Sequence, residues 1–359
     1  MFDIVDEINR EEESESSLRP QRIKDYIGQE KIKNEFEIYL KAAKKRNEPL
    51  DHVLLYGPPG LGKTTLANII ANEMGANIKT VVGPNIERTG DLASLLSSLT
   101  PGDVLFIDEI HRIPMVVEEL LYSVMEDFKL SINIGRDGES RNITIDLPPF
   151  TLIGATTKAG NLSLPLRERF GISGHFEYYS IEELMTIIER TSSIFNLPID
   201  SEASYEIALR SRGTPRVANK LFRRIRDFAT LSNSKVISKY ETMKALNELQ
   251  IDELGLDEID RKYLLTLIER YKGKPTGLTN IAIAIGEDPA NLEDVYEPYL
   301  VKMELINRTS RGRVPTYKAY KHMNLLDLYT GTDEKYFELY IFIYIILKLY
   351  LLNDKVNNV

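Results

Sequence analysis

The sequence predicts an α/β protein in which a parallel sheet is followed by a helical unit and then by three helices with a hairpin. Apolar runs at residues 53–56, 104–107 and 151–155 do not alternate with polar residues, as expected of strands covered on both faces. A glycine-rich turn and a helical stretch follow the first run, which is the β–α alternation of a parallel sheet. Beyond residue 180 the apolar runs give way to amphipathic helices.

The length of 359 residues exceeds the usual size of one hydrophobic core, so we expect several domains. The boundaries follow from changes in pattern along the chain. We predict an acidic flexible arm (1–17), a large sheet domain (18–180), a helical lid (181–254), a domain of three helices and a hairpin (255–323) and a tail (324–359).

The amino-acid composition indicates a globular protein and excludes several kinds of site. An apolar fraction of 43% and a charged fraction of 28% are typical of a globular fold. The absence of cysteine excludes structural disulfides, thiol catalysis and cysteine-based zinc sites, and four histidines leave little for an imidazole metal site. The first residues lack the positive flank and apolar core of a secretory signal, so we expect a cytoplasmic protein.

The net charge of −9 is unevenly distributed. Residues 1–17 carry seven acids against one arginine, or −6, a pattern typical of a solvated arm. Residues 302–321 carry six lysines or arginines against one glutamate, or +5. Nucleic acid, if bound, is therefore expected at a local basic patch near the C-terminal end.

The segment GPPGLGKTT at residues 57–65 follows a predicted strand and precedes a predicted helix, the context of a phosphate-binding loop. Glycines such as Gly60 and Gly62 allow the sharp turn that aims backbone N–H groups at phosphate oxygens. Lys63 is expected to reach the terminal phosphates, and Thr64 to coordinate Mg²⁺. Thr65 is expected beside the α-phosphate. We therefore expect an ATP site.

The segment LFIDEIH at residues 105–111 ends the next strand with two carboxylates. Asp108 is expected to orient Mg²⁺, and Glu109 to polarise the water that attacks the γ-phosphate. Together with the upstream loop, the pair predicts phosphoryl transfer from ATP to water.

Three later positions complete the predicted catalytic set. In GATT, which closes a third strand, either Thr156 or Thr157 is expected to hold the attacking water or sense the γ-phosphate; we assign Thr156 and leave the choice open. Arg169 in LRERF and Arg216 in GTPR carry the fixed planar charge that stabilises a transferring phosphoryl group. Taken alone, an arginine of this kind is more often part of a surface salt bridge than a catalytic group.

The third domain has the pattern of a winged helix-turn-helix: helices from residue 257, around 278–285 and around 292–303, then a hairpin that turns at 310–312. The basic hairpin favours DNA contact through Arg308, Arg311 and Arg313. A generic three-helix packing module is the alternative.

The order of motifs GPPGLGKTT, LFIDEIHR, LPPFTLIGATT, LPLRERFG, GTPRVANKL, LEDVYEPYL and RTSRGR resembles the RuvB family across roughly residues 15–323. The resemblance implies an AAA+ P-loop NTPase sheet domain, a small helical lid domain and a C-terminal winged-helix domain. It also implies an ATP-dependent, DNA-translocating motor, a homohexameric ring that drives branch migration of Holliday junctions in recombination and repair.

The same resemblance assigns further site residues. Leu18 and Arg19 would lie by the adenine with Tyr26 and Ile27. Tyr179 and the backbone of Glu126, Asp127 and Phe128 would also line the nucleotide site. Arg169 would be an arginine finger acting on the nucleotide of the neighbouring subunit, and Arg216 a second sensor in the lid.

Residues 129–147 alternate around GRDGES, which predicts a protruding hairpin. In the family this hairpin docks on RuvA, the junction-binding partner, and RuvC resolvase is a further expected member of the complex. The alternative is an ordinary insertion packed on its own domain.

The chain departs from the family pattern at two places. Pro289, in EDPAN, stands where relatives tend to have a basic residue, which puts one DNA contact in doubt. The apolar run at residues 337–352 extends past the usual family end. Its uninterrupted core, 339–347, is far shorter than the roughly 18 residues of a spanning helix, so no stable membrane association is expected.

Two rival functions fit parts of the pattern. A clamp-loader-like or initiator-like AAA+ protein would use ATP as an assembly switch on DNA. An ATP-holding, non-enzymatic DNA binder would work through its winged domain alone, and the presence of Glu109 and Arg169 argues against it.

Overall fold

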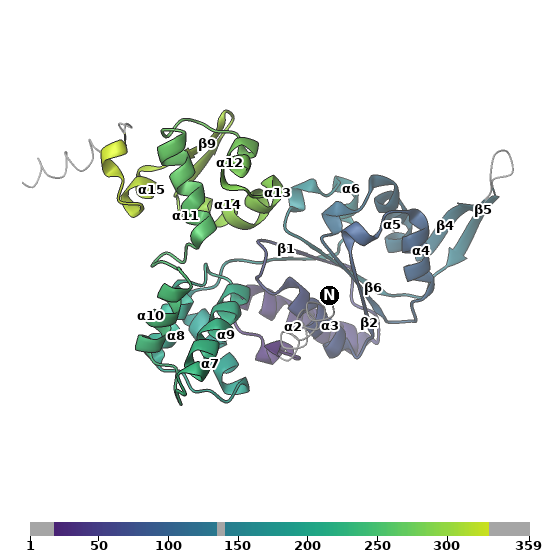
Figure 1. The fold of residues 1–359 in the computed structure, drawn as a ribbon. Coiled ribbons are helices and arrows are strands. Elements are labelled where there is room, and N and C mark those ends of the chain that lie inside the picture. The colour runs from purple at the N-terminus through teal and green to yellow at the C-terminus, as the bar shows by residue number, and fades with distance from the viewer. Residues whose placement is uncertain (1–17, 135–140, 330–359) are drawn as a thin grey trace, which may run out of the picture. The chain divides into compact units, whose positions relative to one another are not determined.

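The computed structural model of the chain describes residues 18–134 and 141–329, and the chain divides into two compact units, Met1–Ala245 and Leu246–Val359. Figure 1 shows the elements of each unit. The predicted acidic arm (1–17), the hairpin turn (135–140) and most of the predicted tail, including its apolar run, lie outside the described residues.

The first unit is built on a five-stranded sheet in which every pairing is parallel. Strand β1 lies between β6 and β7, so the phosphate-binding loop leaves the sheet from an interior strand. Buried residues fill β1, β3 and β6, which confirms the predicted two-sided cover. The strands, in order across the sheet, are β2 (Ile78–Val82), β3 (Val104–Asp108), β6 (Thr151–Thr156), β1 (Val53–Tyr56) and β7 (Ile172–His175).

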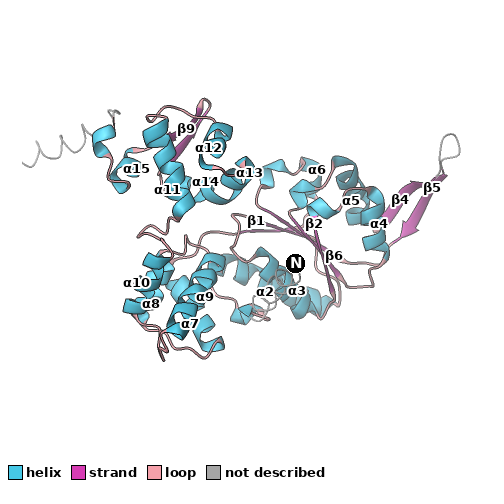
Figure 2. Cartoon of the chain, viewed as in Figure 1, coloured by secondary structure: helices cyan, strands magenta, loops and turns pink. Residues whose placement is uncertain are grey.

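Helices cover both faces of this sheet, as Figure 2 shows. Leu105 and Ile107 of β3 pack with Leu92 and Leu121 in one apolar cluster, so the intervening Phe106 faces the opposite side, because side chains alternate along a strand. The helices of this part are α2 (Glu30–Arg46), α3 (Lys63–Met74), α4 (Thr89–Ser97), α5 (Met115–Asp127) and α6 (Leu164–Glu168), with single turns η1 (Ile23–Asp25), η2 (Gly83–Asn85), η3 (Ile110–Arg112) and η4 (Ala159–Asn161).

The predicted hairpin is confirmed as the antiparallel pair β4 (Lys129–Ile134) and β5 (Arg141–Asp146). Its base is anchored by the buried Leu130, which belongs to the apolar cluster beneath α5. Farther along β5, Ile143 and Ile145 are two residues apart on one face and are 43% and 37% exposed. The hairpin therefore presents apolar side chains to its surroundings.

The predicted helical lid is confirmed as four helices, α7 (Ile181–Ile194), α8 (Ser201–Leu209), α9 (Pro215–Leu231) and α10 (Lys239–Glu248). Helix α7 begins at a capping box in which the Ser180 hydroxyl accepts from the Glu183 N–H, while the Glu183 carboxylate accepts from the Ser180 N–H. Thr214 caps α9 with Pro215 as its first helical residue. These caps fix where two lid helices start.

The second unit has the predicted three helices and wing. Its elements are α11 (Glu258–Leu265) with η5 (Thr266–Arg270), α12 (Leu278–Ile285), a third helix formed by α13 (Pro289–Asn291), η6 (Leu292–Tyr296) and α14 (Glu297–Lys302), the wing strands β8 (Ile306–Thr309) and β9 (Gly312–Pro315), α15 (Tyr317–His322) and η7 (Leu326–Leu328). Gly312 opens β9 with a φ of 134°, and a Cβ there would lie 2.5 Å from the carbonyl oxygen of Thr276. This close approach requires glycine.

A buried carboxylate lies beneath the wing. Glu297 is fully buried and accepts a hydrogen bond of 2.6 Å from the Tyr263 hydroxyl. Arg313 of β9 donates from Nε to Glu297 Oε1 over 2.8 Å, and an Nη2 of Arg308, on β8, lies 2.7 Å from Glu297 Oε2. A buried charge is tolerated only when it is paired and hydrogen-bonded, and here it has three partners.

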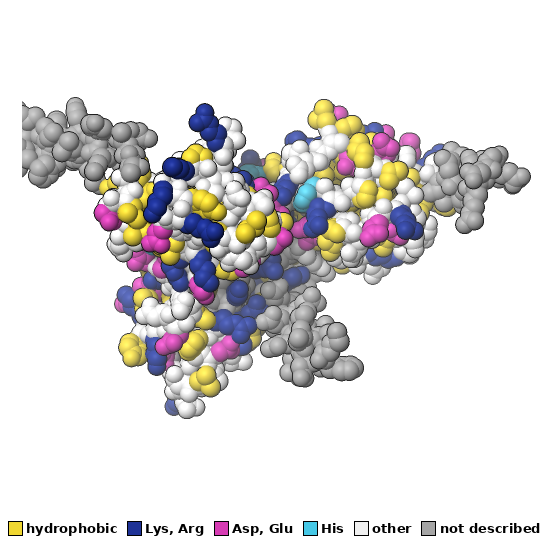
Figure 3. Space-filling model, turned by 45° about the horizontal axis from the view of Figure 1, so that its top comes forward, with side chains coloured by type: hydrophobic (Ala, Val, Ile, Leu, Met, Phe, Trp, Pro, Cys, Tyr) yellow, Lys and Arg dark blue, Asp and Glu magenta, His cyan; other side chains and the backbone are white. Residues whose placement is uncertain are grey.

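Because of the Glu297 cluster, the three wing arginines that the sequence predicts to contact DNA differ in how available their side chains are. The Arg313 side chain is only 18% exposed and its guanidinium is engaged by Glu297 and Glu293, which argues against a DNA contact. The Arg308 side chain is 42% exposed and shares Glu297, whereas Arg311 lies in the turn and is exposed. Figure 3 shows Lys and Arg side chains at the surface of this unit. Arg311 is therefore the best placed of the three.

Among the described residues, no helix combines the length and apolarity needed to cross a membrane.

We expect Arg313→Ala to destabilise the second unit and Arg311→Ala to leave it unchanged. Loss of one partner of a buried ion pair lowers the free energy of unfolding by about 3–5 kcal/mol. We expect the lower end of this range, because Arg308 still pairs with Glu297. An exposed substitution stays within about 0.5 kcal/mol. Hydrogen exchange of the α14 and β9 amides in the full chain measures both. Equal protection in the two variants would show that the Glu297 cluster does not stabilise the wing.

Candidate nucleotide site

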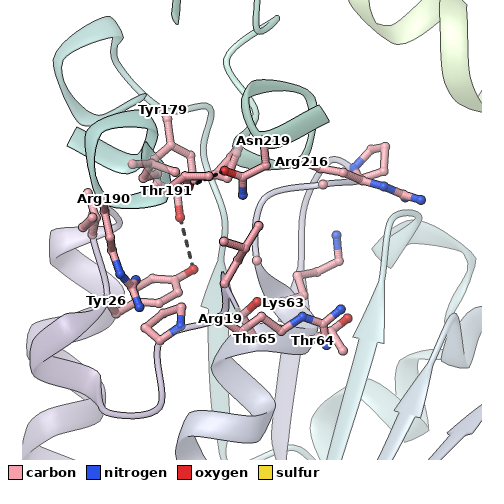
Figure 4. Close-up of a pocket in the computed structure, with 18 of the residues that line it drawn as sticks. Arg19, Tyr26, Lys63, Thr64, Thr65, Tyr179, Arg190, Thr191, Arg216 and Asn219 are labelled. Carbon is pink, nitrogen blue, oxygen red and sulfur yellow. Dashed lines mark hydrogen bonds between the residues drawn. The ribbon is translucent and has the colours of Figure 1, made fainter. Parts of the chain in front are cut away.

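A cavity of about 450 Å³ opens at the carboxyl edge of the sheet in the first unit (Figure 4). It brings together the segment before η1, the turn after β1, the end of β3 and the lid helices α7 and α9. The residues that line it are Leu18, Arg19, Pro20, Tyr26, Ile27, Pro59, Gly60, Gly62, Lys63, Thr64, Thr65, Asp108, Glu109, Thr157, Tyr179, Ile187, Arg190, Thr191, Pro215, Arg216 and Asn219.

The turn after β1 is shaped by three glycines. Gly57, Gly60 and Gly62 have φ values of 140°, 77° and 99°, a region that other residues rarely adopt. A Cβ at Gly57 would lie 2.6 Å from the Phe176 carbonyl oxygen. Helix α3 begins directly after the turn, at Lys63, and its first N–H groups have no partner within the helix. The site is thus a backbone cradle for an anion.

Lys63 is buried in this cradle, and its Nζ donates to the carbonyl oxygens of Gly57 and Pro58, each over 2.8 Å. Burial lowers the pKa of Lys63 to about 8, and the carboxylates of Asp108 and Glu109 partly oppose the shift. A phosphate beside the ammonium group would favour the charged form. Lys63 is therefore placed to exchange its carbonyl contacts for phosphate oxygens.

The two predicted magnesium ligands meet at the floor of the cavity. The Thr64 hydroxyl donates to Asp108 Oδ2 over 3.3 Å, and the other carboxylate oxygen of Asp108 accepts from the Glu109 N–H. The described residues hold no group of three or more acidic, histidine or cysteine side chains suited to a metal. This donor set fits Mg²⁺, which uses one or two protein ligands and takes the rest from phosphate and water.

Glu109 lines the same cavity with an unusual backbone. Its φ of 49° turns the chain sharply after β3, and its carboxylate accepts from Nη1 of Arg112 over 2.9 Å. The Glu109 side chain is 40% exposed, so this ion pair is solvent-screened. The carboxylate can therefore be released from Arg112 at small cost.

The structure distinguishes the two threonines that the sequence leaves open. Thr156 is buried, its hydroxyl lies 2.9 Å from Nδ1 of His111, and it accepts from the Lys158 N–H over 2.9 Å. Thr157 instead lines the cavity, and Thr156 is not among the lining residues. The geometry thus favours Thr157 as the group that faces a nucleotide, with Thr156 fixing the loop on His111.

The lid contributes lining residues that the sequence analysis does not identify. Ile187, Arg190 and Thr191 lie three and four positions apart and so share one face of α7, which closes the cavity from the lid side (Figure 4). Thr191 donates to Asn219 over 2.8 Å, and Arg190 donates to the Asp25 carbonyl oxygen over 3.4 Å. Their spacing was visible in the sequence, but nothing in it indicates which face of α7 meets the nucleotide.

Arg169 and the segment 126–128 lie apart from this cavity. Arg169, at the end of α6, is 3.0 Å from Glu126 Oε1, donates to the Pro165 carbonyl oxygen, and stacks 4.6 Å from the centre of the Tyr122 ring. Phe128 packs against His52 and Phe150. Glu126, Asp127, Phe128 and Arg169 are not among the residues that line the cavity of their own chain.

A phosphate-binding loop, two carboxylates after the neighbouring strand and a separate helical lid carrying Arg216 define an AAA+ P-loop ATPase domain. Three family models match successive parts of the chain: the Holliday junction DNA helicase RuvB P-loop domain at residues 18–176, the RuvB AAA lid domain at 179–252 and the RuvB C-terminal winged helix domain at 253–324. The chain belongs to the RuvB family.

Solved structures agree with this assignment. The Thermotoga maritima RuvB Holliday junction branch migration motor is 49% identical, with a TM-score of 0.78, over 86% of this chain and 98% of that one. A point variant of T. maritima RuvB is 48% identical, with a TM-score of 0.79, over 88% of this chain and 100% of that one.

Proposed function

We propose that this chain is an ATP-hydrolysing motor that moves duplex DNA at Holliday junctions. The observation that carries the proposal is the convergence of Lys63, Thr64, Asp108 and Glu109 on one cavity. Membership of the RuvB family and a winged-helix unit with an exposed basic turn support the DNA substrate.

Each residue of the cavity has a distinct task in this proposal. Gly60, Gly62 and Lys63 hold the phosphates, Thr65 lies by the α-phosphate, and Thr64 and Asp108 would hold Mg²⁺. When bound, Mg²⁺ neutralises charge on the phosphate oxygens. Glu109 accepts a proton from the attacking water, Thr157 orients that water, and Arg216 contacts the nucleotide from the lid.

Leu18, Arg19, Tyr26 and Ile27 form the other end of the cavity, where we place the base of ATP. Leu18 and Tyr26 are buried, so this end is largely apolar apart from backbone groups, Arg19 and the Tyr26 hydroxyl. An apolar slot with a few polar groups is the usual environment of a planar ligand.

Glu109→Gln should bind ATP and Mg²⁺ normally but lose turnover and junction unwinding, because binding uses Lys63 and Thr64 whereas water activation needs a carboxylate. The assay follows strand separation of a synthetic four-way junction, with and without RuvA, alongside ATP affinity. Lys63→Ala should lose affinity, and Glu48→Gln, away from the cavity, serves as the control. ATP turnover without any junction movement by the wild type would favour an assembly switch instead.

Arg169 is assigned to the nucleotide of a neighbouring subunit in a six-membered ring. Two features support this: Arg169 does not line its own chain's cavity, and exposed apolar side chains surround the starts of α5 and α6. Met115, Val116 and Leu164 are 56%, 59% and 65% exposed. Exposed apolar residues of this kind suit packing against another subunit. Glu126 lies 3.0 Å from Arg169, so the segment Glu126, Asp127 and Phe128 would face that neighbour's nucleotide together with it.

Arg169→Ala alone should nearly abolish hydrolysis while ATP binding survives, because an arginine finger supplied in trans is worth about 10³–10⁵ in rate. Mixing Arg169→Ala subunits with Lys63→Ala subunits should restore activity, since some interfaces then join an intact loop to an intact arginine. Mixed rings that stay inactive would mean either that Arg169 acts within its own chain or that one dead site silences the whole ring. A fusion of two subunits with one intact interface then separates action within the same chain from silencing of the whole ring.

The β4–β5 hairpin is proposed to bind RuvA. RuvC is proposed as a further member of the same complex. We place this complex in the cytoplasm. The apolar pair Ile143 and Ile145, exposed on one face of β5, supports a protein partner.

Replacing both isoleucines, as Ile143→Asp with Ile145→Asp, should abolish RuvA capture but spare basal ATPase activity, because charges on that face oppose apolar docking. Pull-down of RuvA by the full-length variant measures the first and phosphate release the second. Ile38→Asp, an exposed substitution on α2, is the matched control. RuvA capture at the wild-type level would place the docking surface elsewhere.

A further inference from the structure

Two buried tyrosine hydroxyls converge on one carbonyl of the phosphate-binding loop. The Tyr26 hydroxyl donates to the Leu61 carbonyl oxygen over 3.4 Å and the Tyr179 hydroxyl over 3.2 Å. The hydroxyls are also 3.2 Å from one another, as the dashed line between them in Figure 4 marks. The two side chains come from residues 153 positions apart, yet both reach the same peptide.

The contacted carbonyl belongs to the peptide that enters α3. The described peptide bonds are trans, and a planar trans peptide directs its C=O and N–H to opposite sides. Holding the Leu61 oxygen toward the tyrosines therefore sends the Gly62 N–H away from them. Gly62 lies at the cap of α3 and lines the cavity, so this N–H belongs to the set that would meet a phosphate.

The two tyrosine side chains also pack closely against the backbone around the Leu61–Gly62 peptide. A Cβ at Gly62 would lie 2.6 Å from the Tyr26 hydroxyl, so the tyrosine occupies the side of Gly62 where a side chain would stand. A Cβ at Gly28 would lie 2.5 Å from the Tyr179 ring, which fixes that ring against the segment after Tyr26. Neither hydroxyl can move far without shifting the loop.

Either tyrosine hydroxyl can supply the hydrogen bond to the Leu61 carbonyl oxygen on its own. Two hydroxyls have two hydrogens for three contacts, so the loss of either hydroxyl leaves one donor for the Leu61 oxygen. Burial raises the pKa of Tyr179 to about 12 and that of Tyr26 well above its ordinary value. Both groups thus remain donors at any working pH.

The two tyrosines also connect different parts of the unit. Tyr26 follows η1 at the base end of the cavity. Tyr179 stands between β7 and the first residue of α7, and its N–H donates to the Gly213 carbonyl oxygen just before α9. The Leu61 carbonyl is therefore tied both to the base-binding segment and to the start of the lid.

We propose that Tyr26 and Tyr179 are positioning residues for the phosphate cradle, because through the Leu61 carbonyl they hold the Gly62 N–H toward the place of the phosphates. The inference rests on the proposed ATP site. It predicts that the hydroxyls affect binding of the phosphates and leave binding of the base unchanged. A pair that only packs the floor of the cavity would affect both.

The test uses Tyr26→Phe, Tyr179→Phe and the double variant of the full chain, which keep the rings and remove only oxygen. Affinities for ADP and for adenosine are measured by competition against a fluorescent nucleotide. Each single variant should weaken ADP binding by less than about threefold, because one donor remains. The double variant should lose about tenfold or more, since a hydrogen-bonded carbonyl is left without a partner. Adenosine affinity should stay within twofold in all three.

Tyr39→Phe, on the exposed side of α2, controls for the loss of a hydroxyl, and thermal unfolding confirms that each variant is folded. Equal losses for ADP and adenosine would overturn the proposal in favour of simple packing. Unchanged ADP affinity in the double variant would overturn it as well. Wild-type protein that fails to bind ADP would instead refute the nucleotide site itself, and the positioning role with it.

Discussion

The turn from β1 into α3 is the constraint on which the rest of the first unit depends. Three glycines with positive φ bring the chain from an interior strand to a helix N-terminus within a few residues. The carboxyl ends of β3 and β6 reach the same edge, because the strands are parallel. The parallel strand order therefore places Asp108 and Thr157 beside the phosphate-binding loop, and no additional contact of these two residues is needed to bring them there.

Sequence reasoning was strongest where backbone geometry and residue type constrain one another. The phosphate-binding loop requires glycines at defined spacings between a strand and a helix, so Gly60, Gly62 and Lys63 could be assigned before any fold was known. The two-sided burial of β1, β3 and β6 left apolar runs that are readable in the sequence. The hairpin and the wing followed from strand patterns with turn residues between them.

Prediction from the sequence was weakest where a side chain has several possible contact partners. Nothing in the sequence shows that Thr156 contacts His111 whereas Thr157 lines the cavity, because Thr156 is the last residue of β6 and the bend at Thr157 sets the direction of the next side chain. Likewise Arg311 and Arg313 look alike in RTSRGR, and only the position of Glu297 beneath the wing separates them. The contribution of α7 depends on packing between segments far apart in the chain.

The Glu297 cluster has a mechanical consequence. One carboxylate joins β8 through Arg308, β9 through Arg313 and α11 through Tyr263, while it is itself part of the third helix. A hairpin fastened at both strands resists bending at its base. A force applied at the Arg311 turn would therefore be passed to the helices through both strands at once.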